Sequence, residues 1–292
     1  MSEIGNKTVK VDIDLIDETF NASLSENYHL SIQTGPGRLT FCVFNTVINK
    51  YIVLRNYLLN SVDLHSLVNE CHFIFDNDDL LRLKYKSSSH LWISPRCTLV
   101  PDHLFDPGET DSYLTFNHGS IGGELIMQNH IKSAHLYNIF SCPEALMALL
   151  RQHQPNITFY HQSTPFIESV IAGMSSWGGS GMAVYFYYNW LDIVAVKDNK
   201  LLFYNTFQIT APEDSVYYFV GVANLLRIDL PSTKLMYAGN VKHIPPEVAI
   251  LESYVERIVE CEPPNAVVYS QHILEPFRKN FLNLINLYGC ES

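Results

Sequence analysis

Two stretches of the chain repeat one pattern of apolar and polar positions. In the first stretch, residues 28–32, 39–44 and 51–54 are apolar runs of strand length. Gly35-Pro36-Gly37 lies in the first break, at residues 33–38, and cannot continue a strand ladder. Short connections of this kind predict three antiparallel strands, and apolar residues at helical spacing between positions 62 and 71 predict a helix after them.

The same pattern returns at residues 182–209, where turns at 189–190 and 198–199 separate three apolar runs. A proline followed by two acidic residues at 212–214 then opens a predicted helix, since acidic groups in a first turn suit the helix dipole. We predict four further elements in this half: a strand at 234–238, a helix at 246–259, a short strand at 266–269 and a last helix at 276–287.

The segment between the two copies alternates strands and helices. Short apolar runs from residue 90 are followed by an irregular stretch at 102–123, two more strands, a helix at 143–152, a strand at 157–160 and a helix at 164–173. The glycine-rich segment 175–181 is the expected flexible linker between the two halves of the chain. The sequence therefore predicts an α/β fold in two lobes: residues 1–174, with an irregular insert at about 95–125, and residues 175–292.

Composition narrows the function classes. The 292 residues are 47% hydrophobic, and 19 basic against 30 acidic residues leave a formal net charge of −11, which argues against nucleic acid or an anionic membrane surface as the main partner. The N-terminal sequence lacks a secretory pattern, and no run of about 18 apolar residues predicts a membrane span. We expect a cytoplasmic protein whose six widely spaced cysteines are free thiols.

No catalytic or metal site is predicted from spacing. The 12 histidines form no HExxH or HxH pattern. Ser180 lies in a glycine-rich segment, but Met182 replaces the last glycine of a nucleophile turn, which favours a linker. Cys142 precedes a predicted helix without a nearby base, which favours a structural role.

Four segments carry a resemblance to a known family: YHLSIQ and LTFCVFN in the first copy, CTLVPDHLF at 97–105 and HQSTPFIESV at 161–170. Over residues 12–287 the chain resembles a bacterial family of uncharacterised proteins with an actin-like ATPase fold. Its segment STPFIESVIAG is also similar to the actin-like assembly proteins of type IV pili. The resemblance implies a two-lobed, ribonuclease H-like architecture in which each lobe begins with one copy of the three-strand pattern.

The resemblance also implies where ATP and Mg²⁺ would bind. In nucleotide-using relatives the first hairpin of each lobe wraps a phosphate, and a glycine pair after a later strand approaches the adenosine. The corresponding candidate residues for an interlobe cleft are Gln33, Thr34, Gly35, Tyr188, Asn189, Gly239 and Asn240. Pro36 removes an N–H donor from the first turn, and the preceding strand contains no aspartate. Most of the features that the resemblance implies for ATP and Mg²⁺ binding are therefore altered in this sequence.

Asp192 is the remaining carboxylate near the second hairpin. Alternation along the strand favours a solvated residue beyond the turn. The alternative interpretation makes Asp192 the magnesium ligand of a nucleotide-binding protein or weak ATPase. A third alternative is an unrelated catalytic site in the irregular segment 102–123.

Aromatic residues crowd the second hairpin, with Tyr185, Phe186, Tyr187, Tyr188 and Trp190 on one strand and its turn. Internal packing is the favoured explanation. Aromatic residues on both faces of the strand also make Tyr188 and Trp190 candidate interface residues. We accordingly expect a non-catalytic binding or scaffolding protein with an unidentified protein partner and no cofactor.

Overall fold

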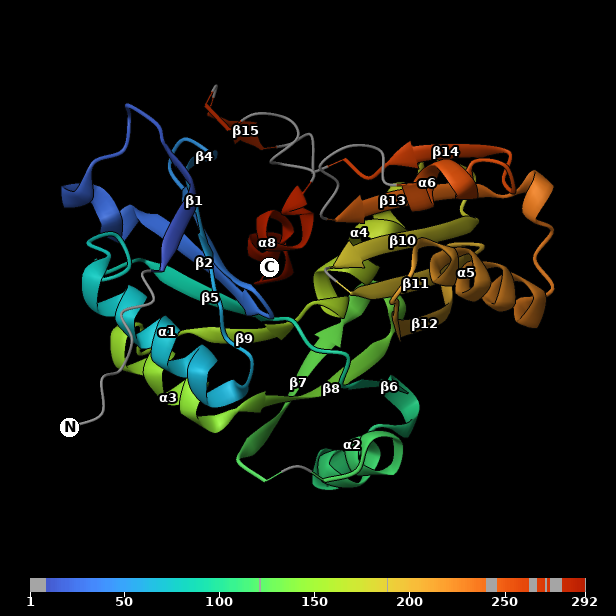
Figure 1. The fold of residues 1–292 in the computed structure, drawn as a ribbon, viewed down its shortest axis with the longest axis horizontal. Helices are drawn as coiled ribbons and strands as arrows, with labels where there is room; N and C mark the ends of the chain where they lie inside the picture. The colour runs from blue at the N-terminus through green and yellow to red at the C-terminus, as the bar shows by residue number, and fades with distance from the viewer. Residues whose placement is uncertain are drawn as a thin grey trace.

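The structure, a computed structural model, describes residues 9–120, 122–187, 189–239, 246–262, 267–270, 272–273 and 280–291. Two large sheets stand side by side, and a smaller sheet with one helix lies below them (Figure 1). Both large sheets contain a three-strand antiparallel meander whose first strand pairs in parallel with a fourth strand, which pairs in parallel with a fifth; the first sheet also has β1 and β15 against the last meander strand. The predicted duplication of the meander is therefore present in the fold.

The first sheet has the order β1-β4-β3-β2-β5-β9. Its strands are β1 (Lys10–Ile16), β2 (Tyr28–Gly35), β3 (Arg38–Asn45), β4 (Lys50–Leu58), β5 (Ser87–Trp92) and β9 (Thr158–His161). Helices α1 (Leu64–Asn77) and α3 (Glu144–His153) cover one face, and their apolar residues form a core with β2, β3 and β4. The short helix at Ala22–Asn27 precedes β2. The sequence analysis missed β1 although charged and apolar residues alternate along it; this edge strand is largely exposed and lacks the apolar run by which the other strands were recognised.

The second sheet has the order β12-β11-β10-β13-β14. Its strands are β10 (Gly181–Tyr187), β11 (Trp190–Lys197), β12 (Lys200–Gln208), β13 (Lys234–Gly239) and β14 (Arg257–Glu260). Helices α5 (Pro212–Leu226) and α6 (Pro246–Leu251) cover one face. A short 3-10 helix, Leu230–Ser232, leads into β13.

One prediction in this half was wrong. The predicted helix at 246–259 ends at residue 251, and its last part is the strand β14, paired in parallel with β13. Ile258 and Val259 pack against different cores on opposite faces of the sheet, so this short apolar run has no one-sided pattern to distinguish a strand from a helix.

The prediction of an irregular insert at about 95–125 was wrong, because its residues contribute to a third sheet and a helix. Strands β6 (Cys97–Pro101), β8 (Leu136–Pro143) and β7 (Glu124–Ile131) are antiparallel, with β8 in the centre. Within the stretch expected to be irregular lies the helix α2 (Thr110–His118), preceded by 3-10 turns at Asp102–Leu104 and Pro107–Glu109. A further 3-10 turn, Lys132–Ala134, joins β7 to β8. The helix was missed because a single buried leucine, Leu114, anchors it.

Two helices cross between the large sheets (Figure 1). Helix α4 (Ser163–Ser175) follows β9 of the first sheet, yet its apolar residues pack against the second sheet. Helix α8 (Leu282–Asn286), extended by the 3-10 helix Leu287–Glu291, follows the second sheet but packs against β2 and β3 of the first.

The short strand β15 (Val268–Tyr269) likewise pairs with β4 of the first sheet. The described residues 268–270, 273 and 281–288, which the sequence division assigned to the second lobe, thus lie against the first sheet.

Candidate functional site

The ends of the two predicted phosphate hairpins touch each other. In the first hairpin Gly35 pairs with Arg38, so the turn itself contains only residues 36–37 and is shorter than predicted. A Cβ atom on Gly35 would lie 2.6 Å from Ile93 Cβ and 3.0 Å from the hydroxyl oxygen of Tyr187, which ends β10. The second hairpin therefore packs directly on the first, with no room for a side chain at Gly35.

The other candidate residues of the first hairpin are buried. Gln33 is 1% exposed and Thr34 is 0% exposed. The Thr34 hydroxyl and His90 Nε2 lie 2.7 Å apart, so this hydroxyl is already engaged within the first sheet. Neither side chain lines an open phosphate loop.

Arg38 places a positive charge at the junction of the two hairpins. Its guanidinium carbon lies 5.7 Å from the ring centroid of Tyr187 and 5.9 Å from that of Phe281, and the residue is 8% exposed. Within the described part of the chain its Nε has no hydrogen-bond partner. Aromatic faces on two sides stabilise this cation.

Gly239 has a structural reason to be glycine. Its φ is +111°, and an added Cβ would lie 2.0 Å from the carbonyl oxygen of Phe186. The close approach of β13 to β10 thus requires glycine here, whether or not a nucleotide binds. Asn189 is exposed in the second hairpin turn, whereas Tyr188 and Asn240 lie outside the described residues.

Asp192 is buried, so the prediction of a solvated residue was wrong. The side chain is 1% exposed and accepts hydrogen bonds from Thr206 Oγ1 at 2.7 Å and from Gln162 Nε2 at 3.0 Å. Burial raises the pKa of Asp192 to about 6, although these hydrogen bonds oppose the shift. A carboxylate already bonded to two neighbours has less capacity to coordinate Mg²⁺.

Gln162 belongs to a buried polar run whose role the sequence analysis missed: His161, Gln162, Ser163 and Thr164, at the end of β9 and the start of α4. Gln162 joins the two large sheets, because its Oε1 accepts from the backbone N–H of Ser94 at 3.1 Å while its Nε2 donates to Asp192. The sequence does contain a sign of this network, because these four consecutive polar residues lie between two apolar segments.

His161 and Ser163 continue this network toward the small sheet. The backbone N–H of Ser163 donates to His161 Nδ1, so the proton of the neutral ring is on Nε2, which donates to the Ser94 carbonyl at 2.8 Å. The Ser163 hydroxyl lies 2.7 Å from Nδ1 and accepts from Asn138 Nδ2 at 2.8 Å. The histidine and serine are both 0% exposed, and their hydrogen bonds connect the end of the first sheet to β8 of the small sheet.

The described residues contain no group of three or more His, Cys, Asp or Glu side chains placed to hold a metal ion. All six cysteines are free thiols, as predicted. Burial raises the pKa of Cys97 and of Cys261 to about 12, and it raises that of Cys142 further, which makes these thiols poor nucleophiles at neutral pH.

A pocket of about 270 Å³ lies beside the two hairpin ends; we call it the hairpin-end pocket. Its apolar lining comes from both hairpins, from the end of β5, from α1 and the residues before it, and from the small sheet: Pro36, Val62, Leu67, Trp92, Pro143 and Trp190. Val62 is 92% exposed at its rim. Trp190, a predicted interface residue, is half-buried and also packs against the apolar cluster between the two large sheets, which contains α4.

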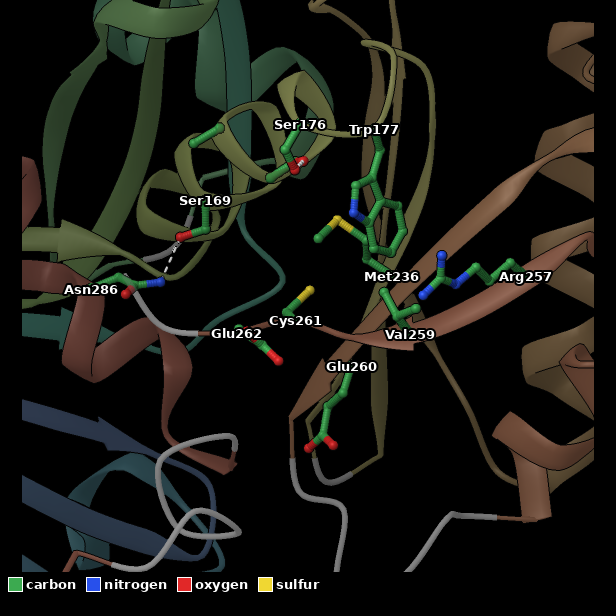
Figure 2. A pocket seen from close by; sticks show the side chains of 12 residues that line it. Ser169, Ser176, Trp177, Met236, Arg257, Val259, Glu260, Cys261, Glu262 and Asn286 are labelled. Atoms are coloured by element: carbon green, nitrogen blue, oxygen red, sulfur yellow. Dashed lines mark hydrogen bonds between the residues drawn. The ribbon is translucent and has the colours of Figure 1, made fainter. Parts of the chain in front are cut away.

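A second cavity, of about 490 Å³, lies where α4 and α8 approach β13 and β14; we call it the helix-crossing cavity (Figure 2). Asn286 Nδ2 on α8 donates to Ser169 Oγ on α4 at 2.6 Å and ties the two helices together at one side of it. Of the residues predicted for the interlobe cleft, the five that the structure describes do not line this cavity.

A family model matches residues 17–258, which is most of the chain. The chain belongs to the family described as "Protein of unknown function (DUF3822)". No curated protein matches it. The family assignment agrees with the predicted resemblance to uncharacterised proteins.

Two solved structures show the fold. A Bacteroides thetaiotaomicron protein "with actin-like ATPase fold and unknown function" is 22% identical, with a TM-score of 0.81 over 93% of this chain and 99% of that one. A chain of the PilM–PilN type IV pilus biogenesis complex is 11% identical, with a TM-score of 0.59 over 90% of this chain and 99% of that one. The protein has the predicted actin-like ATPase fold, and identities this low establish the fold alone. No helix in the described ranges is long and apolar enough to cross a membrane.

Proposed function

We propose that this protein is a non-catalytic binding or scaffolding protein, in which an actin-like ATPase fold holds a protein partner instead of hydrolysing ATP. The observation that carries the proposal is the contact between the hairpins: Tyr187 fills the space at Gly35 where a phosphate would approach the backbone. The proposal includes no nucleotide cofactor and places the protein in the bacterial cytoplasm.

The rival function, ATP and Mg²⁺ binding in the interlobe cleft, has one feature in its favour. The buried guanidinium of Arg38 stands at the hairpin junction with its Nε unpaired among described neighbours, and arginine is a frequent phosphate ligand. Phosphate binding there would require Tyr187 to move away from Gly35.

Isothermal titration calorimetry with ATP and Mg²⁺ separates the two functions. We expect no binding tighter than about 1 mM, since a cellular ligand must approach its ambient concentration to occupy a site. A control titration of Arg38→Gln measures any contribution from that cation. Tighter binding by the wild-type chain, lost in Arg38→Gln, would establish the rival and overturn the proposal.

We place the partner interface at the hairpin-end pocket. Small apolar pockets that take one anchoring side chain are typical centres of protein interfaces, and Trp92 and Trp190 supply the aromatic lining favoured there. The actin-like neighbour PilM was solved together with PilN, which supports protein partnering on this architecture.

Affinity capture from the native cell tests this placement with two matched variants. Val62 at the pocket rim is 92% exposed, and Val47 in the β3–β4 turn is 72% exposed, so glutamate at either position is compatible with folding. We expect Val62→Glu to lose a partner that both wild type and Val47→Glu recover. Equal recovery by all three baits would remove the interface from this pocket.

A further inference from the structure

The outer face of α5 is apolar although it is exposed to solvent. Tyr217 is 75% exposed and Leu225 is 72% exposed, and with Gly221 between them they form an i, i+4, i+8 row along one side of the helix. A Cβ atom added to Gly221 would have no atom within 4 Å, so the described part of the chain leaves the middle of this row uncovered. The opposite side of α5, with Phe219 and Ala223, packs into the core of the second sheet.

Charged residues are missing from this stretch of α5. The sequence SVYYFVGVANLL at 215–226 contains none, whereas the exposed side of α1 carries the polar residues His65, Asn69 and Asp76. A surface helix normally presents charged and polar residues on its outer face. An uncharged face with an exposed tyrosine and an exposed leucine is typical of a surface that contacts another protein. Figure 1 shows α5 at the side of the molecule away from the first sheet, where a second molecule can approach it.

The spacing along this face is self-complementary. Tyr217 and Leu225 each lie four residues from Gly221, which is roughly 6 Å along the helix axis. If a second copy of α5 crosses antiparallel at Gly221, each Tyr217 therefore lies beside Leu225 of the other copy. The missing side chain at Gly221 allows the two helix axes to come close. A two-fold axis at Gly221 thus lets the same residues of each copy cover the exposed row of the other.

The two ends of α5 carry opposite charges. Glu213 lies in its first turn and Arg227 directly follows its last residue; both are exposed, and neither forms an ion pair with a described residue. Glu213 lies eight residues before Gly221 and Arg227 six residues after it, so antiparallel copies bring Glu213 and the other copy's Arg227 to within roughly 3 Å along the axis. A parallel arrangement would instead bring like charges together. The charges therefore favour an antiparallel second copy as the partner of this face.

We propose that the protein forms a two-fold symmetric dimer through the outer face of α5, with Tyr217 of each copy packed against Leu225 and Gly221 of the other. One helix pair buries less area than a standard protein interface, so the dimer is weak, with a dissociation constant of about 10–100 µM. None of the described residues that line the hairpin-end pocket belongs to α5, so the dimer holds or fails independently of the proposed partner interface.

Sedimentation velocity of the full chain between about 1 and 300 µM tests the proposal, because this range brackets the expected dissociation constant. We expect the average mass to rise from that of the monomer toward that of the dimer. Gly221→Leu enters open space and replaces a glycine within a helix, so the monomer should fold normally. Its side chain separates the two helices, and the dimer should weaken at least about tenfold. A chain that stays monomeric throughout, or a Gly221→Leu dimer as tight as wild type, would overturn the proposal.

A second pair of variants tests the aromatic contact. Tyr217→Glu places a carboxylate in the apolar centre of the interface and should weaken the dimer about tenfold or more. Phe73→Glu is the matched control, at an aromatic residue of α1 that is 53% exposed, and it should dimerise like wild type. Equal behaviour of the two variants would remove the interface from α5.

Charge exchange tests the antiparallel arrangement. Glu213→Lys and Arg227→Glu each place like charges opposite one another at both ends of the helix pair, and each alone should dimerise about two- to fivefold more weakly. In a one-to-one mixture of the two variants, the heterodimer regains two pairs of opposite charge and should be as tight as the wild-type dimer. A mixture no tighter than either variant alone would refute the assigned pairing.

Discussion

The two large sheets share an arrangement of five strands but bury ionisable groups of opposite kind on them. In the first sheet, β2, β5 and β9 each carry a buried histidine: His29, His90 and His161. The strands of the second sheet carry none, and instead Asp192 is buried on β11. The repeated strand pattern thus specifies the backbone arrangement of a lobe but not its chemistry.

This difference gives the lobes opposite responses to pH. Burial lowers the pKa of His29 and of His90 to about 3 and that of His161 to about 4, so the unfolded chain binds more protons below pH 6.5 and the stability falls there. Asp192 has a raised pKa of about 6. Its contribution to stability is present below pH 3.8 and is lost as pH rises through 6.

The largest expected effect is acid unfolding through the histidines of the first sheet. Each should cost about 3 kcal/mol of stability between pH 6.5 and pH 4. Urea denaturation followed by circular dichroism at pH 7.5, 6, 5 and 4 measures the slope. His90→Gln should flatten it by about a third, whereas His65→Gln, at an exposed site on α1, should not. A wild-type stability that stays constant over this range would contradict the prediction.

Gly239→Ala should be the most damaging single substitution among these tests, by about 3–5 kcal/mol. The new Cβ would overlap the Phe186 carbonyl in a backbone conformation that favours glycine. The matched control is Gly221→Ala on α5, where nothing lies within 4 Å, and alanine should stabilise by about 0.5–1 kcal/mol. Equal effects in urea denaturation would mean that β13 and β10 are not held this closely.

Asp192→Asn tests the opposite slope of the second sheet. Because the variant cannot ionise, wild type should lose about 2 kcal/mol relative to it between pH 4.5 and pH 7.5. The measurement is the difference between two denaturation series, so the histidine contributions cancel. A difference independent of pH would show that Asp192 stays ionised in the folded protein.

Gly35→Ala, the smallest expected effect, sharpens the comparison of the two hairpins. The added methyl group meets Ile93 and Tyr187, and overpacking should cost about 1–2 kcal/mol. Gly122→Ala, in open space, should change stability by less than about 0.5 kcal/mol. If the hairpins touch as described, Tyr187→Phe, which removes the hydroxyl 3.0 Å from the added methyl group, should couple with Gly35→Ala and relieve part of the cost.

Much of the fold could be predicted from the sequence, because each meander strand is a separate apolar run ended by a turn. The strand β14 could not, since the half-buried Ile258 and Val259 pack on opposite faces and only the parallel pairing with β13 makes this run a strand. The sheet against which α8 packs could not be predicted either. Its apolar pattern indicates burial but does not say which sheet receives it.

Less of the candidate site could be predicted. Pro36 and the aromatic second hairpin indicated an altered phosphate site, but the contact between Tyr187 and Gly35 depends on how the lobes pack. Alternation suggested that Asp192 faced solvent, whereas Gln162, thirty residues earlier, covers it. The helix-crossing cavity combines residues from four elements that no local pattern connects.

The exchange of α4 and α8 between the sheets has a consequence for dissecting the protein. A protease cut in the glycine-rich segment after α4 would leave each fragment holding a helix that completes the other fragment's core. We therefore expect the nicked halves to co-elute as a non-covalent complex. Neither half expressed alone would bury its apolar surface, so we expect the two lobes to be stable only as one folding unit.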